Sequence, residues 1–214
     1  MSDLFSALAV RIGVLYVILQ GNLWTVMVRG NTFGELFTLT SFGESHSEYI
    51  GGSVDGFPGG VVLDMDFIKQ ELARRRPSSI FSTKRIETDD VEFISGLEDG
   101  KTLGLPLAFI IPNNNIRKGD YDCFKDLFRP SHGDYTYHNK YGIIASSGGG
   151  RASGRETAAR VVGGALAKLF LKRYGITFSS KLTEIGGFDC DREKEEVEKR
   201  LKEAYEKRDS LGGK

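Results

Sequence analysis

The chain has little cysteine, little histidine and no excess of charge of either sign, and each shortage excludes a class of protein. Two cysteines in 214 residues cannot form the disulfide framework of a small secreted domain, and they favour a reducing, cytoplasmic location. Its 29 basic and 29 acidic side chains cancel, so charge gives no reason to expect nucleic acid or an anionic membrane as a partner. The chain is long enough, and at 40% hydrophobic residues apolar enough, to bury a core.

The chain also lacks an apolar run of the roughly 20 residues that a membrane-spanning helix needs. The longest candidate, residues 4–19, is interrupted by an arginine and a glycine. It is a poor secretory signal as well, because Asp3 stands where positive charge is expected and no small-x-small cleavage site follows. We expect residues 1–29 to be an apolar leader or upstream extension outside the fold, and residues 30–214 to form the domain. A membrane-surface anchor stays open as an alternative for the leader, although no basic face supports it.

Strand-like and helix-like patterns alternate along the rest of the chain and predict an α/β (α+β) fold. Strands are expected at residues 33–40, in two short pieces within 53–63, and at 91–97, 105–112 and 176–185. Helices are expected from Asp64 or Asp66 to Arg76, from Ser153 to Gly175, and from about Arg192 to Lys207. The nearly all-apolar segment 105–112 is expected to be buried on both faces. Ser153 and Glu156 form the pattern of a capping box at the start of the second helix.

Polar residues without helical or strand periodicity fill residues 113–141, which we expect to be an irregular loop. Loops of this length inside compact domains are uncommon, and those that occur tend to be functional. The loop contains His132 and His138, two of the three histidines of the chain. The loop and the turns around it are therefore the expected place for residues that carry chemistry.

Three short clusters have residue types suited to a binding or catalytic site: GESH at 43–46, RPSHGDY at 129–135 and GGGR at 148–151. Glycines before a helix let the backbone approach a ligand, and the helix start offers unpaired N–H groups and a positive dipole end. Arg151 adds a planar guanidinium suited to phosphate. The third cluster is thus a candidate anion site, although most glycine runs before helices are only turns.

His46 and His132 are candidates for acid–base chemistry, since an imidazole gains and loses its proton near neutral pH. The alternative, that both are structural or surface imidazoles, stays open on spacing alone. Neither has a second ligand at the spacing of a metal site, so no metal is expected. His138 is expected to be an exposed loop residue. The run Arg74–Arg76 fits a solvated helix end that complements the helix dipole, or less simply a phosphate clamp.

Long, ordered and correctly spaced strings through residues 30–213 resemble the chorismate synthase family. They are GNTFGELFTLTSFGESH (30–46), VDGFPGG (54–60), ELARRRP (71–77), LFRPSHGDYTYHNKYG (127–142), GGGRASGRETAARVVGGALAKL (148–169) and DSLGG (209–213). The resemblance implies the family's layered β-α-β sandwich, of which this chain would form the first half.

It also implies a lyase that converts 5-enolpyruvylshikimate 3-phosphate to chorismate and phosphate by 1,4-anti elimination, in aromatic amino-acid biosynthesis. The family uses reduced FMN, which can lend electron density while phosphate leaves. By analogy His46 would protonate the leaving phosphate, and His132 would manage the proton of the reduced flavin. The resemblance further places flavin contacts at Arg151, Ala152 and Ser153, and an NADP contact at Arg75 in members that reduce their own flavin.

The chain departs from the family pattern at several positions. Ser47 follows His46 where glycine is usual, Ala152 stands where serine is usual, and residues 144–147 lack the usual acidic residue and arginine. The family continues beyond the DSLGG string into a second half that supplies further flavin contacts and an aspartate. We therefore expect a truncated, divergent member, which is active, reduced to a flavin- or phosphate-binding fragment, or inactive. Full-length relatives form tetramers, so self-association is expected as well.

Overall fold

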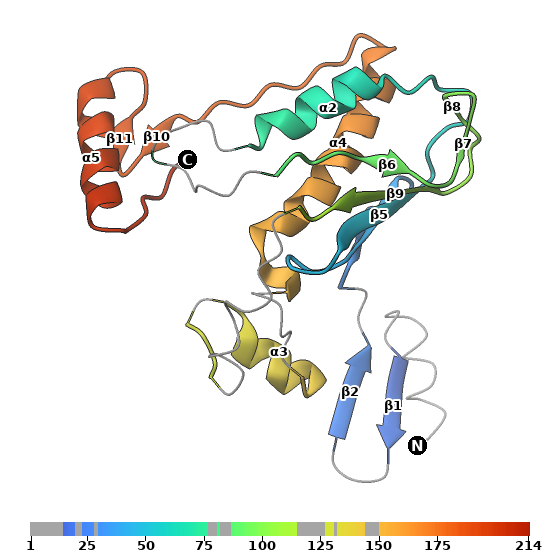
Figure 1. The fold of residues 1–214 in the computed structure, drawn as a ribbon, viewed down its shortest axis with the longest axis horizontal. Coiled ribbons are helices and arrows are strands. Elements are labelled where there is room, and N and C mark those ends of the chain that lie inside the picture. The colour runs from blue at the N-terminus through green and yellow to red at the C-terminus, as the bar shows by residue number, and fades with distance from the viewer. Residues whose placement is uncertain are drawn as a thin grey trace, which may run out of the picture.

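The computed structural model describes residues 30–76, 81, 87–114, 127–130, 132–143 and 150–214, and the backbone of two strands before them. Its centre is a five-stranded antiparallel sheet in the order β3-β4-β5-β9-β6, with helices α2 and α4 packed on one face (Figure 1). The strands of this sheet are β3 (Thr32–Phe33), β4 (Thr38–Phe42), β5 (Tyr49–Asp55), β9 (Leu107–Pro112) and β6 (Glu92–Phe93).

Alternating side chains of the central strands form the core against the two helices. On β9, Leu107, Phe109 and Ile111 are fully buried, while the residues between them are only half-buried. The prediction that residues 105–112 contain a strand is therefore confirmed for 107–112. The prediction that this strand is buried on both faces is wrong, because in the described part of the chain the helices cover a single face of the sheet.

The two helices that pack on the sheet begin and end near the predicted residues. Helix α2 (Met65–Arg74) is capped by Asp64, whose carboxylate accepts from Phe67 N at 2.9 Å, and it ends ahead of Pro77. Helix α4 (Thr157–Lys172) ends in a left-handed Gly175 (φ +74°). The N–H of the next residue then reaches back across the helix end to Leu171 O at 3.2 Å, as a glycine stop requires.

Several expected strands are shorter or absent. Residues 33–40 are not one strand, because left-handed Gly34 breaks them into β3 and β4. The 53–63 segment contributes only the end of β5 and a single bridge at Val62. Of residues 91–97, only β6 and the start of β7 (Leu97–Glu98), which pairs with β8 (Lys101–Thr102), are strand.

The C-terminal part of the chain leaves the core as an exposed segment after α4 (Figure 1). The predicted strand at 176–185 is wrong except for its last two residues, which form β10 (Glu184–Ile185) and pair with β11 (Phe188–Asp189). Helix α5 (Lys194–Glu206) follows, with Val197 and Ala204 as its buried residues. Helix α5 thus has a narrow buried stripe and is mostly exposed to solvent.

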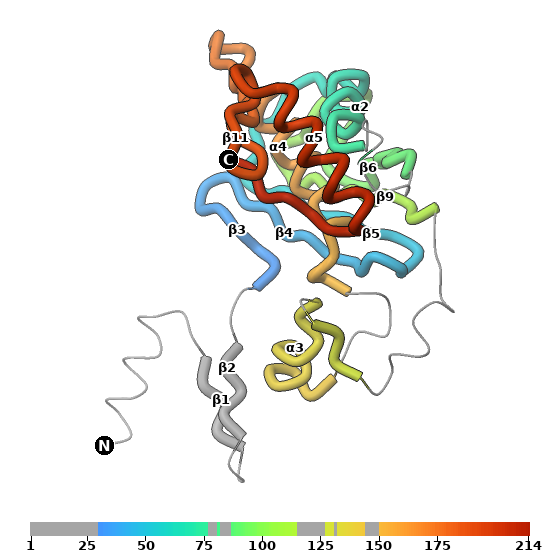
Figure 2. Tube along the Cα trace, turned by 90° about the vertical axis from the view of Figure 1, so that its left-hand side faces the viewer, coloured from blue at the N-terminus to red at the C-terminus, as the bar shows by residue number. Residues whose placement is uncertain are grey.

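The polar stretch 113–141 is not wholly irregular, because Asp134–Tyr141 forms helix α3. Figure 1 and Figure 2 show α3 next to the start of α4. The sequence hides α3 because its few apolar residues give no stripe for one face. His138 is exposed as expected, although it lies on this helix and not in a loop.

Before residue 30 the structure describes only the backbone of β1 (Leu15–Leu19) and β2 (Leu23–Met27), which pair as an antiparallel hairpin. The boundary between a leader and the domain therefore stays a prediction. Cys123 lies outside the described residues, and Cys190 is a free, half-buried thiol. No helix within the described ranges is long and apolar enough to cross a membrane.

Candidate active site

The candidate site is built around two short 3-10 turns that lead into α4. The first, η2 (Gly150–Ala152), carries Arg151 and Ala152, and the second, η3 (Gly154–Glu156), follows Ser153. The Ser153 hydroxyl accepts from Arg155 N at 3.3 Å and so caps η3. The predicted capping box is wrong in its second half, because the carboxylate of Glu156 turns away to the sheet and accepts from the Ser41 hydroxyl at 2.6 Å.

Arg151 joins η2 to the turn that carries His46. Its guanidinium donates to Gly43 O at 3.0 Å and to the Ser41 hydroxyl at 2.6 Å, and it pairs with Glu156 at 3.3 Å. Its Nε is buried and has no hydrogen-bond partner among the residues that the structure describes. Two nitrogens of Arg151 thus donate hydrogen bonds at the end of β4. Its buried Nε–H group is available to a further acceptor.

The loop between β4 and β5, residues 43–48, carries His46 into the protein. The His46 side chain is only 6% exposed, and Ser45 beside it is fully buried. The loop needs Gly43 at its start, where φ is +87° and a β-carbon would lie 2.4 Å from Tyr49 O. A glycine therefore lets the chain turn sharply at the end of β4, so that the next residues fold back toward the core.

The second histidine lies in an exposed turn just before α3. The Nδ1 atom of His132 lies 2.7 Å from Pro130 O. A carbonyl oxygen only accepts, so Nδ1 carries the proton in this contact and Nε2 holds the lone pair of the neutral ring. His132 is thus arranged to accept a proton at Nε2.

An ion pair stabilises this turn. Asp134, in the first turn of α3, accepts from Arg129 Nε at 2.8 Å and from a second guanidinium nitrogen at 2.9 Å. The hydrogen bonds from Arg129 are the main reason that the pKa of Asp134 lies below its usual value, and they outweigh its burial. The carboxylate therefore stays charged at neutral pH and keeps the turn closed beneath His132.

The η2 turn binds the loop that carries His46 and lies close to the turn that carries His132. Arg151 binds the loop of His46, and a β-carbon on Gly133 would lie 3.5 Å from the Cβ of Ala152. The predicted residues Arg151, Ala152 and Ser153 thus form one continuous segment between the two loops. The glycines that precede Gly150 in the GGGR cluster lie outside the described residues. Within the described part of the chain, no group of three or more metal-binding side chains occurs.

Arg75 lies on the other side of this segment, at the end of α2. It donates to Asp89 at 2.5 Å and reaches Gly154 O at 3.5 Å, while its Nε is buried without a partner among the described residues. Of its neighbours in the arginine run, Arg74 pairs with Glu71 on the surface of α2, as a solvated helix end does, and Arg76 donates to Thr88 O. The three arginines thus bind different partners and do not form a single phosphate clamp.

Three buried polar residues near this site escape detection in the sequence: Asp89, Asn113 and Arg155. Arg155 Nε donates to the Asn113 side-chain oxygen at 2.7 Å, and its guanidinium also pairs with Asp89. Asp89 has a left-handed backbone (φ +53°), which is uncommon outside glycine. Nothing in the local sequence of any of them indicates the pairing, because the partners are 42 and 66 residues apart.

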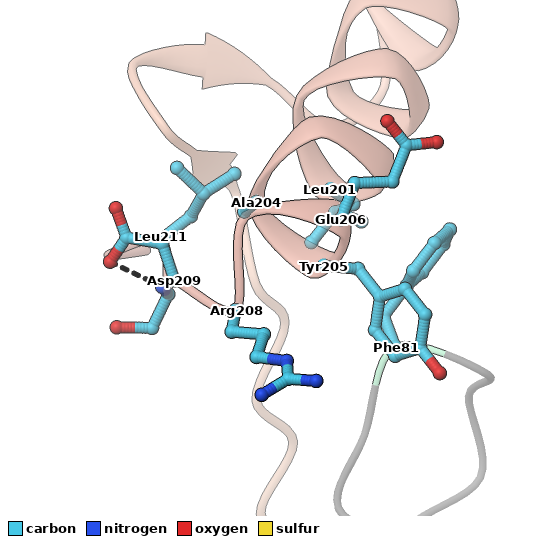
Figure 3. Close-up of a pocket in the computed structure, with 9 residues that line it drawn as sticks. Phe81, Leu201, Ala204, Tyr205, Glu206, Arg208, Asp209 and Leu211 are labelled. Atoms are coloured by element: carbon cyan, nitrogen blue, oxygen red, sulfur yellow. Dashed lines mark hydrogen bonds between the residues drawn. The ribbon is translucent and has the colours of Figure 1, made fainter.

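A separate pocket of about 670 Å³ is lined by the end of α5, by the residues that follow this helix and by Phe81 (Figure 3). Phe81 and Tyr205 lie together on one side of it, in an edge-to-face contact with ring centroids 6.0 Å apart. Its lining contains none of the histidines or of the predicted site residues. It is therefore not part of the candidate site.

The chain was also compared with known proteins. A family model described as chorismate synthase matches residues 37–214. The chorismate synthase of Phocaeicola vulgatus is 53% identical over 164 residues, which are 76% of this chain and 46% of that protein. That of Christiangramia forsetii is 48% identical over 170 residues, covering 79% of this chain and 48% of the relative.

Among solved structures, a crystal structure of chorismate synthase superposes with a TM-score of 0.62 at 28% sequence identity. The match covers 84% of this chain and 56% of that one. The chain thus spans about half the length of the curated relatives that it matches.

Proposed function

Because the chain belongs to the chorismate synthase family, we propose that it takes part in converting 5-enolpyruvylshikimate 3-phosphate to chorismate and phosphate by 1,4-anti elimination. One observation carries the proposal: η2 binds the loop of His46 through Arg151 and lies close to Gly133, the residue after His132. An elimination that expels phosphate needs a proton donor at the leaving group and anion-binding groups around it. The two histidines would be the proton-transfer groups, and the guanidinium of Arg151 with the start of α4 would bind the anion.

The residues present fit an anionic cofactor. Reduced FMN and the substrate both carry phosphate, and two buried guanidinium N–H groups, on Arg151 and Arg75, have no acceptor among the described residues. When bound, reduced FMN lends electron density to the substrate as phosphate leaves and recovers it as hydrogen is lost. Arg151, Ala152 and Ser153 would hold it. Arg75 would meet the phosphate of NADPH if this nucleotide supplies the reducing equivalents.

The two histidines would have different tasks because their surroundings differ. His46 is buried, so water is kept from its imidazole, and it would donate a proton to the departing phosphate. His132 is exposed and has its Nδ1 proton directed at Pro130 O, so its Nε2 would hold or accept the proton of the reduced flavin. We place this reaction in the cytoplasm, in a homo-oligomer.

The proposal is tested by anaerobic incubation of the chain with dithionite-reduced FMN and 5-enolpyruvylshikimate 3-phosphate. We expect release of phosphate and formation of chorismate, together with a change in the flavin spectrum. A spectral change without phosphate release would support the alternative, a flavin- or phosphate-binding fragment, and contradict turnover. If neither signal changes, both functions are wrong for this chain.

Replacing the second histidine gives a sharper test. We expect His132→Ala to lower the rate of phosphate release about 100-fold or more, the usual loss when an acid–base group is removed. His138→Ala is the matched control, because His138 is an exposed imidazole of α3 that contacts the ring of Phe128 and stands outside the proposed machinery. Equal rates for His132→Ala and the unsubstituted chain would overturn the role given to His132.

A further inference from the structure

The loop that carries His46 makes three hydrogen bonds to Asn113, which directly follows β9. The backbone N–H of Asn113 donates to Glu48 O at 2.9 Å. Its side-chain amide donates to Ser47 O at 2.7 Å and to Glu44 O at 3.1 Å. The loop of residues 43–48 is therefore bonded to Asn113 on both sides of His46.

Arg155 sets the orientation of the Asn113 side-chain amide. An arginine only donates, so the atom of Asn113 that lies 2.7 Å from Arg155 Nε must be its oxygen. The NH₂ group must then face the two loop carbonyls, which only accept. The contacts thus leave a single orientation for the amide and use its oxygen and both of its N–H groups.

Arg155 is itself held by buried partners. It is 4% exposed, it donates to Pro112 O at 3.1 Å, and its guanidinium pairs with Asp89. Asp89 is fully buried and also accepts from Arg75. A buried ion pair adds little net stability by itself, because removing charges from water offsets their attraction. What the pair does fix is the position of the Arg155 guanidinium, and through it the geometry of Asn113.

We propose that Asn113 is a positioning residue for His46, with its amide oriented by the Arg155–Asp89 pair. The inference rests on the proposed function, since a positioned imidazole matters only where His46 transfers a proton. Small displacements of a catalytic group are costly, and a shift of about 1 Å can lower a rate about 100-fold. Asn113 reaches no substrate in this scheme and acts only through the loop.

The test reads His46 directly by NMR in the full chain without flavin. The chain has three histidines, so each Cε1–H signal is assigned by replacing one histidine at a time. In Asn113→Asp the carboxylate cannot donate to the loop carbonyls, and we expect the His46 signal to shift and broaden while those of His132 and His138 stay in place. Asn114→Ala is the matched control, because the Asn114 amide donates to Thr88 and not to the loop.

An unchanged His46 signal in folded Asn113→Asp overturns the inference. If Asn113→Asp fails to fold, Arg155→Lys decides, since lysine keeps a positive charge beside Asp89 but lacks the Nε donor to Asn113. A shifted and broadened His46 signal in Arg155→Lys supports the inference, and an unchanged one refutes it.

Turnover with reduced FMN is measured on the same variants. We expect kcat of Asn113→Asp to fall about 100-fold with little change in KM, because binding groups are untouched. A KM effect without a kcat effect would contradict positioning. Absence of turnover in the unsubstituted chain would count against the proposed function alone, since the NMR result does not depend on it.

Discussion

Single charged residues decide how the loops of the site are held. Asp134 illustrates this, because its carboxylate closes the turn before α3 through Arg129 and lies within the field of His132. Its pKa is lower in the folded chain than in the unfolded one. The pair therefore stabilises the turn fully above the usual aspartate pKa, and this contribution is lost as the pH falls through the lowered value.

We expect Asp134→Asn to loosen α3. Losing a charged hydrogen-bonded pair should speed hydrogen exchange of the α3 amides about tenfold to a hundredfold at neutral pH. The difference between Asp134→Asn and the unsubstituted chain should shrink at acidic pH, where Asp134 itself becomes protonated. Asp66→Asn, in the first turn of α2, is the control for loss of a charge at a helix start. Equal protection of α3 in both variants at every pH would contradict this role of Arg129.

At the scale of elements, the approach of α4 to the sheet depends on one glycine. Gly163 faces β4, and a β-carbon there would lie 3.1 Å from a methyl group of Leu39. The next residue, Gly164, faces solvent and has no atom within 4 Å of the same position. Two adjacent glycines of one helix therefore have opposite sensitivities to a side chain.

We predict that Gly163→Val lowers the free energy of unfolding by about 1–3 kcal/mol, because the branched side chain pushes α4 from Leu39. Gly164→Ala should raise it by about 0.5–1 kcal/mol, since alanine favours the helix and meets no neighbour. Urea unfolding followed by far-UV circular dichroism measures both. A stabilising Gly163→Val would show that α4 does not pack on β4 as described.

The ion pair between Lys168 and Glu71 joins α4 to α2 at 2.5 Å. Burial opposes ionisation of Glu71, but hydrogen bonds from Lys168 and Arg74 outweigh it and lower its pKa. The two helices are thus held together by apolar packing and by a carboxylate that stays charged at neutral pH.

For the whole molecule, the sheet face that the described helices leave uncovered is the candidate surface for assembly. Its outer side carries Phe42 and Tyr49, which are 43% and 46% exposed. Apolar and aromatic side chains gathered on one face of a sheet favour association with another surface. This arrangement supports the proposal that the chain forms a homo-oligomer.

Light scattering at micromolar concentration should therefore give a mass above that of one chain. Tyr49→Lys, on the outer face, should lower the measured mass, because it places a charge on the uncovered sheet. Tyr174→Lys is the control, since Tyr174 is an exposed tyrosine beyond the end of α4. A single-chain mass for the unsubstituted protein would contradict self-association.

Local signals in the sequence were sufficient for much of the fold. The cap at Asp64, the Gly175 stop and the apolar stripe of α4 predict helices that the structure contains, because each signal acts within one or two turns. Local signals predict the strands less well. Residues 176–185 have a strand-like composition, but no neighbouring strand pairs with most of them in the described structure. A strand needs a partner, and composition does not supply one.

By itself the sequence determined the family, through long ordered strings, and the residue types from which a phosphate-expelling site could be built. Only the tertiary structure decided which groups work together. Arg151 binds Gly43 across 108 residues, Glu156 turns from its predicted cap to Ser41 across 115, and Arg155 orients Asn113 across 42. Such contacts form when the β4–β5 loop, the end of β9 and the start of α4 pack together. A charge that this packing buries costs free energy unless it is paired, and its partner can come from any part of the sequence.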